Sequence, residues 1–154
     1  MKCNGLSLGF IYRIGLGSLF LLIPFMAVGC GPPEGISVDE AWGRPSPSSA
    51  ANAAFYMNIQ NHGLEMESLL GAEIDICGSV ELHESNVDDN DVMRMEHVEK
   101  IDIPSSSTVQ LQPGGLHIMC IERQADLQSG DTIDIILEFS EIGFVDVKAT
   151  IRDQ

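Results

Sequence analysis

Four side chains with soft or borderline donor atoms, His83, Met95, His117 and Met119, could together hold a metal ion. His117 and Met119 are two positions apart, so on a β-strand both side chains point to the same face. Thioether sulfur selects Cu(I) among biological metals and imidazole accepts it too, whereas zinc sites use Cys, His and carboxylate ligands. The residue types therefore indicate a site for one copper ion, bound most readily as Cu(I).

Three further residues compete with this set or extend it. Met93 shares a strand face with Met95 and is its main rival, and His97 follows on the same face as a candidate auxiliary ligand. His62 falls in an Asn-His-Gly turn, where we expect an exposed side chain away from the metal. A single Met on a strand is usually a core residue. The hypothesis therefore depends on the whole set and its spacing.

The elements that must position these residues are predicted to be short β-strands. Apolar residues alternate or cluster in short runs between turn signals, and no run from residue 36 onward has a long helical period. Regularly spaced short strands predict an all-β fold, a sandwich or barrel. The predicted strands are residues 36–42, 53–60, 68–76, 79–84, 92–98, 108–112, 116–122, 132–139 and 144–151.

Turn residues predict how some of these strands connect. Pro113-Gly114-Gly115 separates two strand-like runs and predicts a β-hairpin between them. The last two strands are expected to form another antiparallel pair. His83 is predicted to end its strand, just before an acidic turn at residues 86–91. The candidate ligands would then lie near strand ends, where loops bring distant segments together.

Residues 1–29 have the pattern of an export signal and are not expected to belong to the fold. Lys2 and Arg13 are the only charged residues in it, and the run from Ile14 to Val28 carries no charge. That run is shorter than the about 20 apolar residues that a membrane-spanning helix needs. We therefore expect an exported protein.

The end of this signal resembles the lipobox of bacterial lipoproteins. Residues 27–30 read Ala-Val-Gly-Cys, with Ala27 where that family usually has Leu. The resemblance implies cleavage before Cys30, a lipid on Cys30 and anchorage to the outer face of the cell membrane, on the periplasmic or extracellular side. Residues 30–35 would be a short tether and residues 36–154 the folded domain. An ordinary signal peptide cut near the same place is the alternative.

Charge and motifs exclude several classes of function. The chain has 8 basic and 23 acidic side chains and a formal net charge of −15, and loss of residues 1–29 would leave −17. This charge argues against nucleic acid as a partner and favours cations and basic protein surfaces. There is no nucleophile triad, phosphate-binding glycine loop or zinc-hydrolase motif, so we do not expect an enzyme.

Two cysteines, Cys77 and Cys120, lie in the predicted domain. An exported chain meets an oxidising compartment, where disulfides persist, so one disulfide between them is possible. Two buried thiols that pack as small apolar groups are the alternative. The sequence leaves both open.

The spacing of the four candidate ligands resembles the signature of the periplasmic copper chaperones called PCu(A)C. That signature is a His, an optional Met, ten residues, a Met, twenty-one residues and His-x-Met. Here Glu84 replaces the optional Met, ten residues separate it from Met95, and twenty-one residues separate Met95 from His117. The resemblance therefore implies four ligands, namely His83, Met95, His117 and Met119.

The resemblance extends over residues 36–151, nearly the whole predicted domain. Segments in family order include AWGRPSP, AAFYMNIQNHG, VELHE, VMRM, PGGLHIM and GDTIDIILEF. It implies a Greek-key β-sandwich related to cupredoxins. It also implies a copper chaperone that delivers the ion to a respiratory cytochrome oxidase, at the binuclear copper centre of its second subunit, or to another copper-assembly factor.

Two other functions remain open from the sequence. A cupredoxin-like electron-transfer protein needs a Cys thiolate with two His and a weak axial Met, and Cys120 is expected to face away from Met119. A metal-free binding module on the cell surface would treat the His and Met residues as incidental.

Overall fold

The computed structural model describes residues 35–45, 49–88 and 91–153. The predicted signal of residues 1–29 and the tether as far as residue 34 lie outside the described residues. Every described residue belongs to one unit, Gly31–Gln154. Within the described segments, no helix is long and apolar enough to cross a membrane.

The described chain consists of β-strands and the turns between them, and the prediction of an all-β Greek-key sandwich is confirmed. Alternating apolar and polar residues favour strands because one face can be buried while the other meets water. The strands are β1 (Ile36–Gly43), β2 (Ala53–Asn61), β3 (Glu67–Glu73), β4 (Ser79–Val87), β5 (Met93–His97), β6 (Ile101–Ile103), β7 (Thr108–Leu111), β8 (Leu116–Ile121), β9 (Thr132–Phe139) and β10 (Gly143–Ile151).

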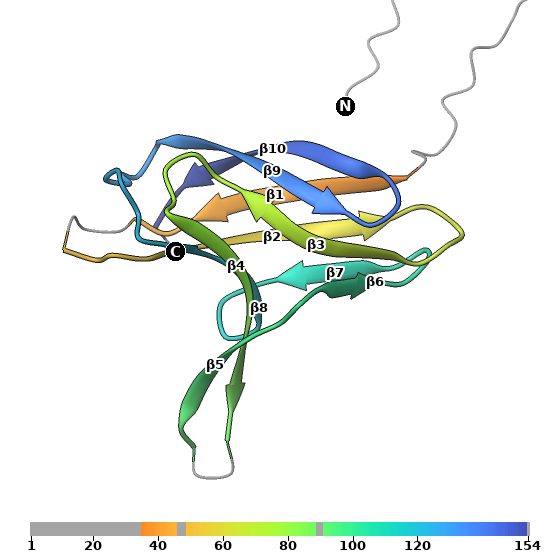
Figure 1. Cartoon of the computed structure of the whole chain (residues 1–154), viewed down its shortest axis with the longest axis horizontal. Coiled ribbons are helices and arrows are strands. Elements are labelled where there is room, and N and C mark those ends of the chain that lie inside the picture. The colour runs from red at the N-terminus through yellow and green to blue at the C-terminus, as the bar shows by residue number, and fades with distance from the viewer. Residues whose placement is uncertain (1–34, 46–48, 89–90, 154) are drawn as a thin grey trace, which may run out of the picture. The chain divides into compact units, whose positions relative to one another are not determined.

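Hydrogen bonds join these strands into one mixed sheet that curls around a core (Figure 1). The order is β5-β4-β8-β2-β1-β10-β9-β3-β6, and β7 also pairs with β2. Only the pairing of β1 with β10 is parallel among the described strands. The predicted antiparallel pair at the end of the chain is confirmed, because β9 and β10 pair along their whole length.

The predicted hairpin around residues 113–115 is wrong. β7 and β8 are joined by a turn in which Gly114 has a φ of +79°, but both strands pair with β2. β7 lies opposite residues 57–60 of β2, and β8 lies opposite residues 53–55. The long edge of β2 thus accommodates two short strands in tandem, which direct β8 toward β4.

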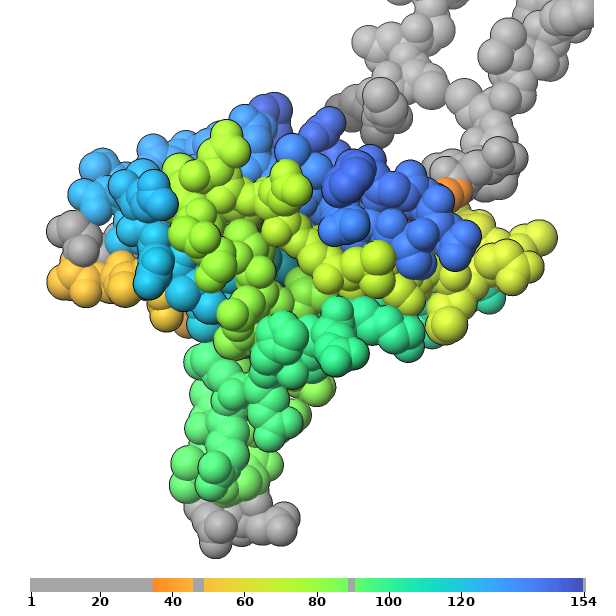
Figure 2. Space-filling view, in the orientation of Figure 1, coloured from red at the N-terminus to blue at the C-terminus, as the bar shows by residue number. Residues whose placement is uncertain are grey.

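The predicted end of the fourth strand is also wrong. We expected it to end at residue 84, but β4 continues to Val87 because residues 83–87 pair with β5. His83 therefore lies in the interior of a strand. Figures 1 and 2 show that the β4–β5 hairpin projects from the body of the sandwich. β3 ends three residues earlier than predicted, and the three-residue β6 was not predicted.

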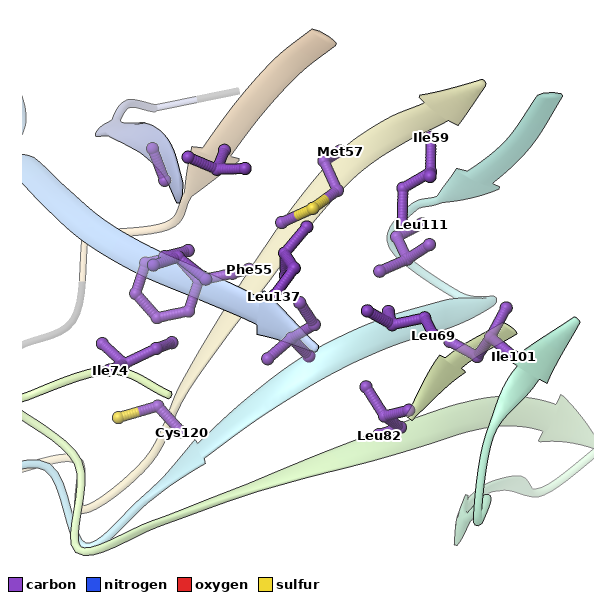
Figure 3. Packing of buried hydrophobic residues seen from close by; sticks show 14 of the residues in the cluster. Phe55, Met57, Ile59, Leu69, Ile74, Leu82, Ile101, Leu111, Cys120 and Leu137 are labelled. Carbon is purple, nitrogen blue, oxygen red and sulfur yellow. The ribbon is translucent and has the colours of Figure 1, made fainter. Parts of the chain in front are cut away.

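The core is built from the inward faces of strands on both sides of the fold (Figure 3). Phe55, Met57 and Ile59 of β2 meet Leu137 of β9 and Leu69 of β3, and all five are buried. Burying an aliphatic or aromatic side chain contributes about 1.5–3 kcal/mol. This packing fixes which face of each strand is left to carry polar side chains.

Cys77 and Cys120 form a disulfide, with Cα atoms 5.4 Å apart and 43 positions apart in sequence. Cys120 lies on the core face of β8 and is fully buried, while Cys77 lies between β3 and β4. The bond therefore ties the β3–β4 connection to the strand that carries His117 and Met119. It resolves the choice that the sequence left open.

We expect reduction of this disulfide to lower the free energy of unfolding by about 2–4 kcal/mol, because it releases a long loop in the unfolded chain. The melting temperature of residues 31–154 should fall by roughly 10 °C with reductant. Thermal unfolding followed by circular dichroism measures this change. The Cys77→Ala/Cys120→Ala variant is the control and should not respond to reductant. A wild type that is equally insensitive would contradict the disulfide.

Candidate metal centre

The alternation of side chains along β8 places two candidate ligands on one face. Ile118 and Cys120 point into the core and are fully buried. His117 and Met119 therefore occupy the opposite face, as predicted. His117 is only 3% exposed even there, because side chains of neighbouring strands cover it.

A cavity of about 390 Å³ opens on this face. Its walls come from β2, β4, β5, β8 and the β7–β8 turn. Met93 and Met95 reach it from β5 and are 60% and 55% exposed. The lining side chains are Arg44, Ala54, Tyr56, Ser85, Met93, Met95, Pro113, Gly114, His117 and Met119. Three of the four predicted ligands thus share one cavity, together with the rival Met93.

The fourth predicted ligand, His83, lies directly beside His117. The two residues are paired across β4 and β8, and their ring centroids are 5.8 Å apart. On its other side His83 is paired with His97 of β5, with ring centroids 6.1 Å apart. Three histidines therefore form a row across three adjacent strands.

Hydrogen bonding fixes which nitrogen of His117 can bind a ligand. Nδ1 lies 2.9 Å from the carbonyl oxygen of Gly115. A carbonyl oxygen only accepts, so Nδ1 carries the proton and donates it. The lone pair of the neutral ring is then on Nε2, the atom left for a metal ion.

In His83 the proton is on the other ring nitrogen, Nε2. Its Nε2 lies 2.8 Å from a carboxylate oxygen of Glu81, which accepts the Nε2 proton. Its Nδ1 is buried and has no hydrogen-bond partner among the described residues. A buried acceptor without a partner costs free energy. Nδ1 of His83 is therefore an open donor atom for a metal ion.

Glu81 is the residue that sequence reasoning missed. It is two positions before His83, on the same face of β4, and that spacing was the available signal. Carboxylates that accept the second ring proton of a metal-bound histidine orient the ring and raise its basicity. Glu81 occupies that position for His83.

Tyr56 forms part of the cavity wall, and its ring contacts other rings on both sides. Tyr56 lies between His117 and Trp42, with ring centroids 6.2 and 4.7 Å from theirs. Burial raises the pKa of the Tyr56 hydroxyl, and the nearby Arg44 lowers it in part. The phenol is therefore neutral near pH 7, and Tyr56 adds no negative charge to the cavity.

The donor set decides which metals the site fits. Among the described residues, no three His, Cys, Asp or Glu side chains are arranged to hold an ion. With the side chains as they stand, a site here needs the methionine sulfurs, which suit soft Cu(I) rather than Zn²⁺ or Ca²⁺. Cys120 offers no thiolate because it is in the disulfide. A blue-copper electron-transfer site built on Cys120 is therefore excluded, because such a site needs a Cys thiolate.

His62 lies apart from this site, as predicted, but the expectation of an exposed side chain is wrong because the ring is partly buried against β1. Its Nε2 is 2.9 Å from the hydroxyl oxygen of Ser37. His62 follows the far end of β2 from Ala54, the β2 residue that lines the cavity next to Tyr56. It therefore serves as a matched reference histidine for tests of the site.

Comparison with known sequences gives a family. The family model named LpqE-like, described as "Putative lipoprotein LpqE-like", matches residues 36–151. "Putative lipoprotein Lxx21020" of Leifsonia xyli subsp. xyli is 31% identical over 120 residues, which are 78% of this chain and 71% of that protein. "Uncharacterized protein RP573" of Rickettsia prowazekii is 28% identical over 109 residues, 66% of this chain and 58% of that protein.

Solved structures share the fold. The apo PCuAC domain of PmoF1 has a TM-score of 0.67 at 23% identity and covers 77% of this chain and 94% of that domain. The copper-bound PCuAC domain of PmoF2 has a TM-score of 0.66 at 22% identity, covering 77% and 93%. The Cu(I) form of DR1885 from Deinococcus radiodurans has a TM-score of 0.59 at 26% identity, covering 75% and 76%. The expected resemblance to PCu(A)C domains is confirmed.

We expect the two candidate ligand histidines, His83 and His117, to be opposite tautomers in the metal-free protein. Long-range ¹H–¹⁵N NMR should show the proton of His117 on Nδ1 and that of His83 on Nε2. Glu81→Gln should redistribute the His83 proton, because an amide can donate as well as accept. Glu84→Gln, an equal charge change on the other face of β4, should leave both rings unchanged. Identical tautomers in the wild type would contradict the assignment.

Proposed function

The chain belongs to the LpqE-like family, and from that premise we propose that it is an exported copper carrier. It binds one Cu(I) through His83, Met95, His117 and Met119 and delivers the ion to another protein. The observation that carries the proposal is that Met95, His117 and Met119 meet at one cavity with His83 beside His117. Each histidine has a ring nitrogen open for metal.

The four ligands have distinct parts in this proposal. His117 and Met119 come from the rigid strand β8, so they form the fixed half of the site. His83 supplies Nδ1 from β4, held by its bond to Glu81. Met95 closes the site from the projecting hairpin, and its neighbour Met93 can take its place because both line the cavity.

Release of copper follows from the exposure of this hairpin. Met93 and Met95 are more than half exposed, and a thioether on an unbranched chain reorients easily. An acceptor can therefore displace these sulfurs first, while His117 and Met119 still hold the ion. The ion changes ligands but not oxidation state, so the transfer needs no electron donor, and we expect no catalytic activity.

We propose a respiratory cytochrome oxidase subunit, or another copper-assembly factor, as the acceptor. The PCu(A)C resemblance supports this acceptor, and so does the acidic surface of the chain, which suits a basic docking site. The DR1885 structure concerns a Cu(I)-bound protein of the same fold. Copper is cargo in this account and leaves with the acceptor.

The lipoprotein family implies export and attachment to a membrane by a lipid. We propose that Cys30 carries that lipid and that the next few residues join it to β1, which begins at Ile36. A short tether would keep the carrier near membrane-bound acceptors. Two or more acyl chains are needed for stable attachment.

We expect residues 31–154 to bind one equivalent of Cu(I) in an anaerobic competition titration against a chromogenic chelator. Met119→Leu removes a fixed sulfur ligand and should weaken binding roughly tenfold or more, since leucine has no soft donor atom. Met66→Leu, at an exposed methionine outside the cavity, is the matched control and should bind as the wild type does.

The variant with His83, Met95, His117 and Met119 all replaced should bind no Cu(I). Equal binding by this variant and the wild type would overturn the proposal and favour a metal-free surface module. Circular dichroism checks that the variant keeps the sandwich, which is expected because none of the four is a core residue.

We expect Cys30→Ser to release the full-length protein from the membrane fraction of the cells that make it, because a serine cannot take the thioether-linked lipid. Fractionation and immunoblotting measure the distribution. Cys3→Ser, earlier in the signal, is the control and should remain in the membrane fraction. A Cys30→Ser protein that has lost residues 1–29 and still remains in the membrane fraction would contradict lipidation at this residue.

A further inference from the structure

We infer that His97, together with His83 and His117, gives the chain a second, imidazole-only mode of binding that takes Cu(II). This inference rests on the proposed position of the copper site. It adds a residue outside the four-ligand set and an oxidation state that the methionines do not favour. The carrier could then also bind copper that is already present as Cu(II).

The register of three strands carries the inference. His97 is directly opposite His83, and His83 is directly opposite His117. Directly opposite residues of antiparallel strands have side chains on the same face, with Cβ atoms about 4.5–5.5 Å apart. The three imidazoles are thus neighbours by backbone pairing and not by chance side-chain rotation.

The ring positions agree with the register. His83 has ring centroids 6.1 Å from His97 and 5.8 Å from His117, and it meets both rings edge to face. Metal–imidazole bonds of about 2.0–2.1 Å place two nitrogens on one ion about 3 Å apart, with the ring centres farther from each other. Each neighbouring pair of rings is therefore close enough to share an ion, and the His97 ring must turn toward His117 for all three to do so.

His97 has the freedom to make that rotation. It is exposed and lies on the projecting hairpin, so turning its ring disturbs no core packing. His83 is already oriented, with Nδ1 unpartnered and buried. The three rings do not enclose an ion as they stand. Binding would therefore draw His97 toward a preformed pair.

The chemistry of the two sides of this site differs. Met93, Met95 and Met119 supply sulfur around the cavity, and thioethers select Cu(I). His97 supplies nitrogen on the far side of His83 from His117, and Cu(II) prefers nitrogen and oxygen ligands in a tetragonal arrangement. His83 and His117 are common to both sets. The same two rings can thus hold either oxidation state, completed by sulfur or by a third imidazole.

Parallel titrations of residues 31–154 with Cu(II) in air and with Cu(I) under anaerobic conditions test the inference. The proteins are the wild type, His97→Asn, Met119→Leu and the reference variant His62→Asn. Competition with a chelator specific for each ion gives the affinity, and electron paramagnetic resonance reports the nitrogen ligands of Cu(II). All the core residues lie within this segment, so it is suited to the measurement.

We expect His97→Asn to weaken Cu(II) binding by roughly tenfold or more while Cu(I) affinity stays within about twofold, because only the Cu(II) set uses this ring. The spectrum should lose the contribution of one nitrogen. Met119→Leu should show the reverse pattern, and His62→Asn should change neither ion.

Unchanged Cu(II) affinity and an unchanged spectrum in His97→Asn would overturn the inference. Cu(II) that binds only adventitiously, at the chain terminus or at surface carboxylates, would give this result. Absence of Cu(II) binding in the wild type would also overturn it. Neither result touches the Cu(I) proposal. That proposal fails separately, if the wild type does not bind Cu(I).

Discussion

The strict alternation of side chains along β8 is the constraint on which the rest of the site depends. Ile118 and Cys120 are committed to the core and to the disulfide, so the strand can neither slip nor rotate. A slip by one residue would turn His117 and Met119 into the hydrophobic core and turn the core residues out of it. The hydrophobic core and the disulfide therefore hold two proposed ligands, His117 and Met119, in place without using either of them for folding.

The pairing of β4 with β8, and of β5 with β4, places further candidate ligands beside those of β8. β4 places His83 against His117, and β5 adds Met95 and His97 on the same face. Of the proposed ligands, His117 and Met119 lie on β8 in the body of the sandwich, whereas the exposed Met95 lies on β5 of the β4–β5 hairpin. Figure 2 shows this hairpin projecting from the body. Such a division suits a carrier, because one half of the site can hold the ion while the other half opens to an acceptor.

The sequence predicts much of this molecule for local reasons. Alternation of apolar residues identified nine of the strands, and the spacing of His and Met identified a set that the fold gathers around one cavity. Which strands pair with each other was harder to predict from the sequence. The Pro-Gly-Gly turn suggested that β7 and β8 pair with each other, but both find the edge of β2, which is distant in sequence. Glu81 and the row of histidines also escaped prediction, because hydrogen bonds and cross-strand neighbours depend on register that no local pattern contains.

X-ray absorption at the copper edge of the Cu(I)-loaded protein would test the central claim most directly. The proposed site predicts a mixed first coordination shell, with nitrogen scatterers from two imidazoles and sulfur scatterers from two thioethers. It also predicts that Met119→Leu removes one sulfur and leaves the nitrogens in place. A shell of nitrogen and oxygen alone, or a sulfur signal that survives replacement of Met93, Met95 and Met119 together, would contradict the account.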